Sequence, residues 1–395
     1  MQLKSIQDAD IKGKRVLVRF DFNVPLSKST PRTITDSNRI DQALPTIKLL
    51  LEKGASKIIM MSHLGRPDGK VDAKYSLEPV AECLAQKLGM DVILSESAID
   101  NGVKNLLHLP ETKLVLLENI RFLAGEEKNE MELAEKLAQY GDIYVNDAFG
   151  AAHRKHASTH AINYFFKNRA YAGLLMKKEI DSLSTLLEKP TKPFIAVIGG
   201  AKVADKIKTI ERMMVLVDHL LIGGAMAYPF LKAKGIEVGK SLCSDEDVVL
   251  AKQILQMDKG SKIRLPVDHI VALNPDSAAQ TTDGASIGAD QMGLDIGPQT
   301  KENYALILKT AKTVFWNGPM GLFEMKAFSE GTMFLAHTIA HLKAFTVVGG
   351  GDSVAAAMES GDAHLFSHVS TGGGASLEYI EKGELPGVQA LKLGV

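Results

Sequence analysis

Arginine and histidine side chains gather just after the apolar segments in the first half of the chain. Four of these segments end in polar sequences, D-F-N at Asp21–Asn23, H-L-G-R at His63–Arg66, E-N-I-R at Glu118–Arg121 and N-D-A-F-G-A-A-H-R at Asn146–Arg154, and Arg39 begins the first helical run. Arginine guanidinium groups match carboxylate and phosphate oxygens with paired hydrogen bonds. The pattern predicts a site for a small, strongly anionic molecule with a hydroxyl that Asp21 and Asn23 could contact. The competing interpretation is a set of unrelated surface arginines in solvated ion pairs.

Glycines take the equivalent places in the second half. Apolar runs there end at Gly199–Gly200, Gly223–Gly224, Gly349–Gly351 and Gly372–Gly374. Glycine lets backbone N–H groups approach phosphates, and a helix N-terminus adds the positive end of its dipole. Asp352 follows one of these clusters and has the hard oxygen ligands that Mg²⁺ prefers. The pattern favours a nucleotide-phosphate site, although tight strand-to-helix turns would also use glycines.

Two motifs that would point to other nucleotide sites are incomplete or absent. The segment GIEVGKS at Gly235–Ser241 is one residue short of a Walker A loop, GxxxxGK[ST]. No GxGxxG occurs at any glycine cluster, which weighs against a nicotinamide-dependent dehydrogenase of a small anionic acid. A two-domain anion-binding or scaffolding protein would explain the arginines, but not Lys202, Asp352 and Glu324 in the other half.

The elements that must position these residues are short apolar runs rich in Val, Ile and Leu. Continuous rather than alternating apolar runs are typical of strands covered on both faces, as in parallel sheets. We expect strands within Val16–Val24, Lys57–Leu64, Lys113–Asn119, Asp142–Phe149, Phe194–Gly200, His219–Gly224, Val314–Pro319 and Phe345–Gly351. Helical patterns between them predict an α/β fold of two doubly wound parallel-sheet, Rossmann-like domains joined by a hinge helix.

Several helix ends can be predicted from single residues. Ser76 is expected to cap a helix that Gly89 ends. Pro45 should kink or restart the helical run Ser37–Glu52. Lys202 is expected in the first turn of a helix beginning near Ala201, with Lys206 one turn further along the same face.

Composition describes an ordinary globular protein. The 395 residues suggest two or three domains, and the net charge of −1 argues against a nucleic-acid or anionic-membrane partner. Only two cysteines occur, Cys83 and Cys243, which fits a reducing compartment. The start has no apolar signal segment, so we expect a cytoplasmic protein. The apolar stretch Met213–Leu231 contains charged and helix-breaking residues, so we expect a helix end, a strand and a loop there rather than a membrane span.

Ten ordered segments resemble the signature segments of the phosphoglycerate kinase family, from about residue 14 to the end. They are RVLVRFDFNVPL, MMSHLGRP, LLENIRF, NDAFGAAHRKHAS, VIGGAKVADKI, LIGGAMA, MGLDIGP, VFWNGPMGLFE, VVGGGDS and STGGGASLEYI. The resemblance implies reversible phosphoryl transfer between 1,3-bisphosphoglycerate and Mg-ADP, giving 3-phosphoglycerate and ATP in glycolysis. It also implies a monomer, with Mg²⁺ as the metal cofactor.

The resemblance further implies a role for individual residues. The phosphoglycerate would be held by Asp21, Phe22, Asn23, Arg39, His63, Leu64, Gly65, Arg66, Arg121 and Arg154. The nucleotide would be held by Lys206, Gly293, Glu324, Gly350, Gly351, Asp352 and Ser353, with Glu324 at the ribose and Asp352 at the metal. The phosphoryl group in transfer would face Arg39, Lys202 and Gly373 at a helix N-terminus.

The resemblance also sets the expected domain limits. A phosphoglycerate domain would span residues 1–172, an interdomain helix 173–190 and a nucleotide domain 191–381, and the tail 382–395 would return to the first domain. The loop Ser27–Thr33 looks slightly longer than is usual in the family.

Overall fold

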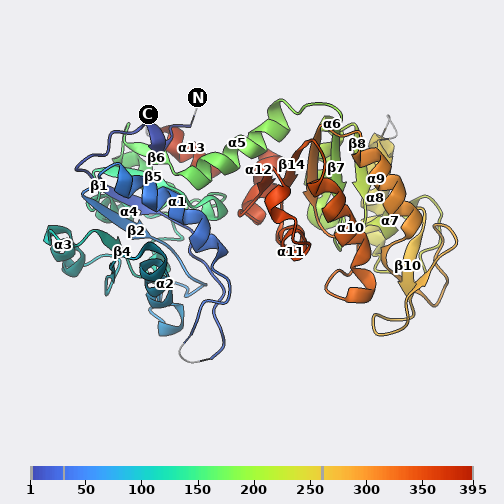
Figure 1. Ribbon diagram of the computed structural model, residues 1–395, viewed down its shortest axis with the longest axis horizontal. Coiled ribbons are helices and arrows are strands. Elements are labelled where there is room, and N and C mark those ends of the chain that lie inside the picture. Colours follow the sequence, from blue (N-terminus) through green and yellow to red (C-terminus); the bar gives the residue numbers. More distant parts are fainter. Residues whose placement is uncertain (1–2, 30–31, 259–261, 394–395) are drawn as a thin grey trace. The chain divides into compact units, whose positions relative to one another are not determined.

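The chain forms two compact units, each built around its own parallel sheet (Figure 1). A computed structural model describes residues 3–29, 32–258 and 262–393. The first unit contains the chain up to Asp181 and the segment from Glu384 onward, and the second unit contains Ser182–Gly383. Helix α5 (Leu174–Glu188) contains the boundary between them.

The sheet of the first unit has six parallel strands in the order β3-β4-β2-β1-β5-β6. The strands are β1 (Arg15–Arg19), β2 (Lys57–Met61), β3 (Val92–Leu94), β4 (Leu114–Leu116), β5 (Ile143–Asn146) and β6 (Ala170–Ala172). The helices are α1 (Asn38–Glu52), α2 (Glu78–Leu88), α3 (Asn101–His108), α4 (Met131–Ala138) and α13 (Pro386–Leu393). Short 3-10 helices are η1 (Ile6–Asp8), η2 (Ala73–Tyr75), η3 (Ile120–Phe122), η4 (Phe149–Ala151) and η5 (Ala161–Phe165).

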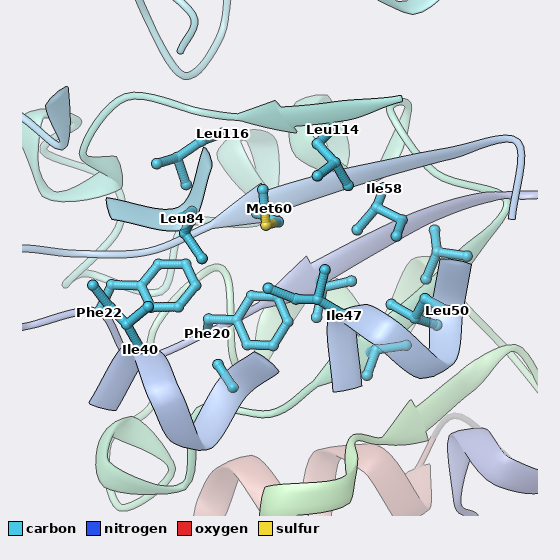
Figure 2. Close-up of a cluster of buried hydrophobic side chains, with 14 of the residues drawn as sticks. Phe20, Phe22, Ile40, Ile47, Leu50, Ile58, Met60, Leu84, Leu114 and Leu116 are labelled. Atoms are coloured by element: carbon cyan, nitrogen blue, oxygen red, sulfur yellow. The ribbon is translucent and has the colours of Figure 1, made fainter. Parts of the chain in front are cut away.

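One core of this unit lies between the sheet and helices α1 and α2 (Figure 2). It contains Phe20 and Phe22 after β1, Ile47 from α1, Met60 from β2 and Leu84 from α2, all without exposed surface. Each such side chain contributes about 1.5–3 kcal/mol by leaving water. Figure 2 shows the two phenylalanine rings side by side, and they stack with ring centroids 5.1 Å apart. This packing fixes the backbone on either side of Asp21.

The second unit has a six-stranded parallel sheet in the order β15-β14-β13-β7-β8-β9. Its strands are β7 (Phe194–Ile198), β8 (His219–Ile222), β9 (Ile263–Arg264), β13 (Thr313–Asn317), β14 (Phe345–Val348) and β15 (His368–Val369). Its helices are α6 (Ile207–Leu216), α7 (Ala227–Ala233), α8 (Asp245–Met257), α9 (Pro298–Leu308), α10 (Glu330–Ala340), α11 (Gly351–Glu359) and α12 (Gly374–Lys382), with 3-10 helices η6 (Ala204–Lys206), η7 (Lys326–Phe328) and η8 (Ala363–Leu365).

A second, antiparallel sheet in this unit was not predicted from the sequence. It has the order β11-β10-β12, with β10 (His269–Ala272), β11 (Gln280–Thr281) and β12 (Met292–Ile296). Strand β11 is exposed and two residues long, so no hydrophobic pattern marks it. The predicted fold class, two doubly wound parallel-sheet domains, is confirmed.

All eight predicted strand segments contain strands. Met213–Leu231 is a helix end and the buried strand β8, as predicted, but α7 begins at Ala227 where a loop was expected. Among the described residues, no helix is both long enough and apolar enough to span a membrane. Helix α1 runs from Asn38 to Glu52 with Pro45 inside it, so it does not restart at the proline. Part of the Ser27–Thr33 loop lies outside the described residues.

Two predicted helix starts are wrong. Helix α2 begins at Glu78 after Leu77, and the Ser76 hydroxyl accepts the Glu78 N–H at 3.2 Å while it donates to Glu118. No helix begins near Ala201, because the Gly200 carbonyl accepts the N–H of Met226 and the N–H of Ala204 binds Asp247 Oδ1. The carbonyl and N–H that would form the first helical hydrogen bond are thus used elsewhere, and α6 begins only at Ile207 after η6.

Candidate active site

The four polar loops of the first unit follow adjacent strands of its sheet. Strands β4, β2, β1 and β5 are consecutive neighbours, and all run in parallel. The loops that begin at Phe20, Ser62, Leu117 and Asp147 therefore leave the sheet at the same edge. The residues predicted from the sequence to bind an anion lie in these loops, and the strand order explains why the loops come together.

Asp21 is the centre of a charged cluster at this edge. Its Oδ2 lies 2.5 Å from Nη1 of Arg39 on α1, and its Oδ1 lies 3.9 Å from Nδ1 of His63. Burial opposes ionisation of Asp21, but the positive charges of His63, when it is protonated at low pH, and of Arg39 and Arg19 outweigh it and lower its pKa to about 2. Asp21 is therefore a carboxylate that can accept a hydrogen bond from a ligand hydroxyl.

Arg19 is a buried member of the cluster that the sequence reasoning missed. Its Nη2 lies 3.1 Å from His63 Nδ1, and its Nε donates to the Ser158 hydroxyl at 2.9 Å. Because a guanidinium can only donate, His63 Nδ1 must accept and the ring proton lies on Nε2. Burial also lowers the pKa of His63 well below its ordinary value. A charged residue inside the apolar run VLVRF was the available signal for Arg19.

The buried carboxyl group of Glu126 lies near Arg19 and interacts with its positive charge. Glu126 has no exposed surface, and it accepts the Ser158 hydroxyl at 2.6 Å and the Ser158 N–H at 3.0 Å. Burial raises the pKa of Glu126, while the nearby Arg19 and the two Ser158 hydrogen bonds oppose that rise. Ser158 thus joins the arginine to the carboxylate and holds the arginine under the site.

Asn23, Gly65 and Arg121 bind one another through the loop after β2. Asn23 Oδ1 accepts the Gly65 N–H at 2.9 Å, and Arg121 Nη1 donates to the Gly65 carbonyl at 2.8 Å. Gly65 has a φ of +63°, and a Cβ there would lie 2.3 Å from the Tyr75 ring. Glycine is therefore required at this position, and the loop holds Arg121 and Asn23 together.

The remaining predicted phosphoglycerate residues divide into exposed and buried positions. Arg66 and Arg154 are exposed; Arg154 Nε lies 3.1 Å from His153 Nε2, and no hydrogen bond or ion pair holds the Arg66 side chain among the described residues. Phe22 and Leu64 are buried in the core of Figure 2. Their side chains therefore pack in the core beneath the loops, so only their backbone groups are available for the contacts expected of them.

The second unit contains a cavity of about 400 Å³ beside the glycine clusters. Gly293, Glu324 and Asp352 line it, as do Gly200 and Gly224. One wall is apolar and was not predicted from the sequence, being formed by Tyr228, Leu242, Met292, Leu294 and Leu322. Such a cavity, mostly apolar with a few polar groups, is typical of a small-molecule site.

Gly293 shapes the apolar wall from strand β12 of the antiparallel sheet. Its N–H donates to the Ser241 hydroxyl at 2.9 Å, and a Cβ at this position would lie 2.2 Å from Tyr228 Oη. A side chain would therefore displace Tyr228 or fill the cavity. The sequence identified this glycine through the segment MGLDIGP, but not the strand that carries it.

Glycines also determine how α11 begins at the edge of the cavity. Gly350 precedes the helix with a φ of +91°, and a Cβ there would lie 2.4 Å from Asn317 Nδ2. Asp352 lies in the first turn, where its carboxylate makes no hydrogen bond or ion pair among the described residues. Ser353 is buried, and its hydroxyl accepts the Gly318 N–H. Gly373 has a φ of +50° and caps α12.

The two lysines near Gly200 differ in their surroundings. Lys206 Nζ donates to the carbonyls of Gly199 at 2.7 Å and Asn317 at 3.3 Å. Burial lowers the pKa of Lys206 to about 8, although Asp352 and Asp205 favour its charged form. Lys202 is exposed, and within the described part of the chain its ammonium makes no hydrogen bond or ion pair. Neither lysine is among the residues that line the cavity.

Comparison with known proteins decides the family. The sequence model described as phosphoglycerate kinase matches residues 6–383. The chain belongs to the phosphoglycerate kinase family. A phosphoglycerate kinase of Anaeromyxobacter sp. (strain Fw109-5) is 51% identical, over 99% of this chain and all of the relative, and one of Bdellovibrio bacteriovorus is 48% identical, over 99% and 97%.

Solved structures of the family agree. The phosphoglycerate kinase of Coxiella burnetii matches with a TM-score of 0.90 at 39% identity, and that of Pyrococcus horikoshii with a TM-score of 0.83 at 31% identity. Each comparison covers 99% of both chains. The function predicted from the sequence, a kinase of the phosphoglycerate kinase family, is confirmed.

Proposed function

We propose that this kinase binds phosphoglycerate at the arginine-lined sheet edge of the first unit and ADP or ATP in the cavity of the second. It transfers a phosphoryl group reversibly between 1,3-bisphosphoglycerate and ADP, giving 3-phosphoglycerate and ATP. The observation that supports this most strongly is that the two units offer candidate binding sites of different chemistry. A cluster of charged side chains lies at one sheet edge, whereas a largely apolar cavity with glycines and a carboxylate lies in the other unit.

Each residue of the first site has a role that its surroundings support. The ionised Asp21 and the amide of Asn23 bind the hydroxyl of phosphoglycerate. Arg66 and Arg154, whose guanidinium groups are exposed, bind phosphate or carboxylate oxygens together with Arg39 and Arg121. His63 presents its Nε2 proton as a neutral donor, because Arg19 occupies Nδ1. Phe22, Leu64 and Gly65 shape the loops and would contact phosphoglycerate through their backbone groups, because the Phe22 and Leu64 side chains are buried.

The nucleotide site combines an apolar slot with a charged edge. The base lies against Gly293 and the apolar wall, and Glu324 accepts hydrogen bonds from the ribose. Backbone N–H groups at Gly350, Gly351 and Ser353, with Lys206, approach the phosphates at the start of α11, where the helix dipole favours anions. Lys202 and the start of α12 at Gly373 stabilise the charge that develops on the transferred phosphoryl group, together with Arg39.

Asp352 fits a magnesium ligand. Its carboxylate lines the cavity and makes no hydrogen bond or ion pair among the described residues, although it favours the charged form of the nearby Lys206, and hard oxygen ligands are what Mg²⁺ prefers. When bound with the nucleotide, the ion supplies positive charge that neutralises phosphate oxygens. Asp352 would hold it at the phosphate end of the cavity.

Transfer requires that the reacting oxygens approach to about 3–3.5 Å. We therefore propose that the two units move toward each other when both substrates are bound, with residues around α5 acting as the hinge. We also propose a cytoplasmic monomer without nucleic-acid or membrane partners, supported by the net charge of −1 and the two free cysteines. Light scattering during size-exclusion chromatography tests the monomer, and a mass twice that of the chain would contradict it.

A coupled assay tests the reaction itself. Purified protein with ATP, Mg²⁺ and 3-phosphoglycerate should form 1,3-bisphosphoglycerate, which a downstream dehydrogenase reports through NADH consumption. Omission of 3-phosphoglycerate is the control for ATP hydrolysis. A protein that binds both substrates but forms no acyl phosphate would contradict the proposed activity.

A further inference from the structure

Two histidines and an aspartate lie together on the second unit, away from the cavity proposed to bind the nucleotide. His337 is on α10, His341 directly follows that helix, and Asp362 precedes η8. One ligand atom from each of the three residues lies within 4.8 Å of those of the other two. None of them lines the 400 Å³ cavity, and the nine-residue helix α11 separates Asp352 in its first turn from Asp362 beyond its last.

The hydrogen bonds of the two imidazoles leave a lone pair on each ring. His337 Nδ1 lies 2.8 Å from Asp362 Oδ2, and His341 Nδ1 lies 2.9 Å from the carbonyl oxygen of His337. Both partners are acceptors, so each Nδ1 carries the proton and each Nε2 keeps its lone pair. Histidines that bind metals usually donate their other ring N–H to a carboxylate or a backbone carbonyl in this way. These contacts therefore fix the tautomer that metal binding requires.

We propose that His337 and His341 form a binding site for a divalent transition metal of the Zn²⁺ type, with Asp362 orienting His337. The two histidines are four residues apart, so they lie on one face of the helix end, and their ring centroids are 4.1 Å apart. Imidazole nitrogens coordinate Zn²⁺ at about 2.0–2.1 Å. Both histidines are exposed, so small side-chain rotations can bring the nitrogens to one ion. Asp362 stays at Nδ1 of His337, where it orients that ring, and water completes the coordination.

The site differs chemically from the proposed magnesium position. Imidazole favours Zn²⁺, Ni²⁺ and Cu²⁺, whereas Mg²⁺ prefers oxygen ligands. A bound ion would hold the two imidazoles together at the end of α10, with the His337–Asp362 contact linking that end to the turn after α11, and so would stabilise the folded second unit by mass action. The simpler alternative is that the His337–Asp362 contact only closes this turn. The two interpretations predict different responses to Zn²⁺.

Calorimetric titration of the metal-stripped full chain with Zn²⁺, in excess Mg²⁺, distinguishes them. Wild type should bind one equivalent that is lost in the double variant His337→Gln/His341→Gln. Asp362→Asn should weaken the Zn²⁺ affinity of this site by roughly 10- to 100-fold, which is the usual effect of removing the hydrogen-bond partner of a metal-binding histidine. His108→Gln, which removes an exposed imidazole from α3, is the matched control and should behave as wild type.

Thermal unfolding supplies a second readout. Zn²⁺ should raise the Tm of wild type and of His108→Gln by more than it raises that of the double variant. Measurements in EDTA show whether each variant is folded without metal, and Asp362→Asn provides the test if the double variant is not. Equal Zn²⁺ stoichiometry and equal Tm shifts in wild type and the variants would overturn the proposal, as would the absence of a saturable equivalent in wild type.

Discussion

Lys202 and Lys206 are close in sequence but have different tasks in the proposed mechanism. The exposed Lys202 ammonium is available to the phosphoryl group in transfer, whereas Lys206 is bound to two backbone carbonyls. Lys202→Met should lower kcat by roughly 100-fold, or about 2.7 kcal/mol, with much smaller changes in both KM values. Lys206→Met should show a larger share of its loss in nucleotide KM. A Lys202→Met enzyme with intact kcat and a raised KM would make Lys202 a binding residue instead.

The buried side chain of Asp295 leads to a prediction about how stability depends on pH. This buried carboxylate accepts the N–H groups of Ile296 at 2.8 Å and Gly331 at 2.7 Å, yet burial raises its pKa to about 7. The folded state then holds a proton that the unfolded state releases, so this group's contribution to stability falls as pH rises from about 4 to about 7. In urea unfolding, Asp295→Asn should lose less stability than wild type between pH 5 and pH 8. Parallel pH profiles would show that Asp295 does not titrate in this range.

Residue types identified much of the candidate site because charged and glycine clusters at strand ends are visible in sequence. Arg19 and Glu126 were missed, since each needs the fold to reveal its partner. Arg19 points from a strand toward Ser158, which is 139 residues away in the chain. The apolar wall of the cavity was missed for a related reason, because Tyr228, Met292 and Leu322 look like ordinary core residues until the strands are assembled.

At the scale of elements, long apolar runs predicted the parallel strands. The starts of α2 and α6 and the short antiparallel strands were not predicted correctly. Runs such as FIAVIGG are buried on both faces, as is typical of strands in a parallel sheet. The start of α6 could not be predicted, because it depends on Asp247 and Met226 taking the hydrogen-bonding groups of a preceding turn. The antiparallel sheet has two-residue and half-buried strands that carry little pattern.

Adjacent glycines at the start of α11 provide a matched test of this element. Gly350 has a φ of +91° and no room for a Cβ beside Asn317, whereas a Cβ on Gly351 would meet nothing within 4 Å. Gly350→Ala should destabilise the protein by about 1–3 kcal/mol, and Gly351→Ala should leave its stability nearly unchanged. Urea unfolding of both variants measures the difference. Similar losses at the two positions would contradict the proposed reason for the glycine at 350.

At the scale of the whole molecule, the fold class followed from alternating strand and helix patterns, but the strand order did not. Neighbours such as β1 and β5 are far apart in the chain, and only the assembled sheet shows that their loops meet. The proposed movement of the two units belongs to this scale. Small-angle X-ray scattering should give a smaller radius of gyration with both substrates bound than with either one. An unchanged radius in the ternary complex would contradict hinge closure.

The assignment of one substrate to each unit is tested most directly by calorimetric binding of 3-phosphoglycerate and Mg-ADP to two exposed-site variants. Arg66→Ala removes charged hydrogen bonds worth roughly 1.5–3 kcal/mol, so it should weaken 3-phosphoglycerate binding by at least about tenfold and leave Mg-ADP binding unchanged. Glu324→Ala should have the opposite pattern. Both side chains are exposed, so an unchanged Tm should show that folding is intact. Equal losses of both ligands in either variant would contradict the account.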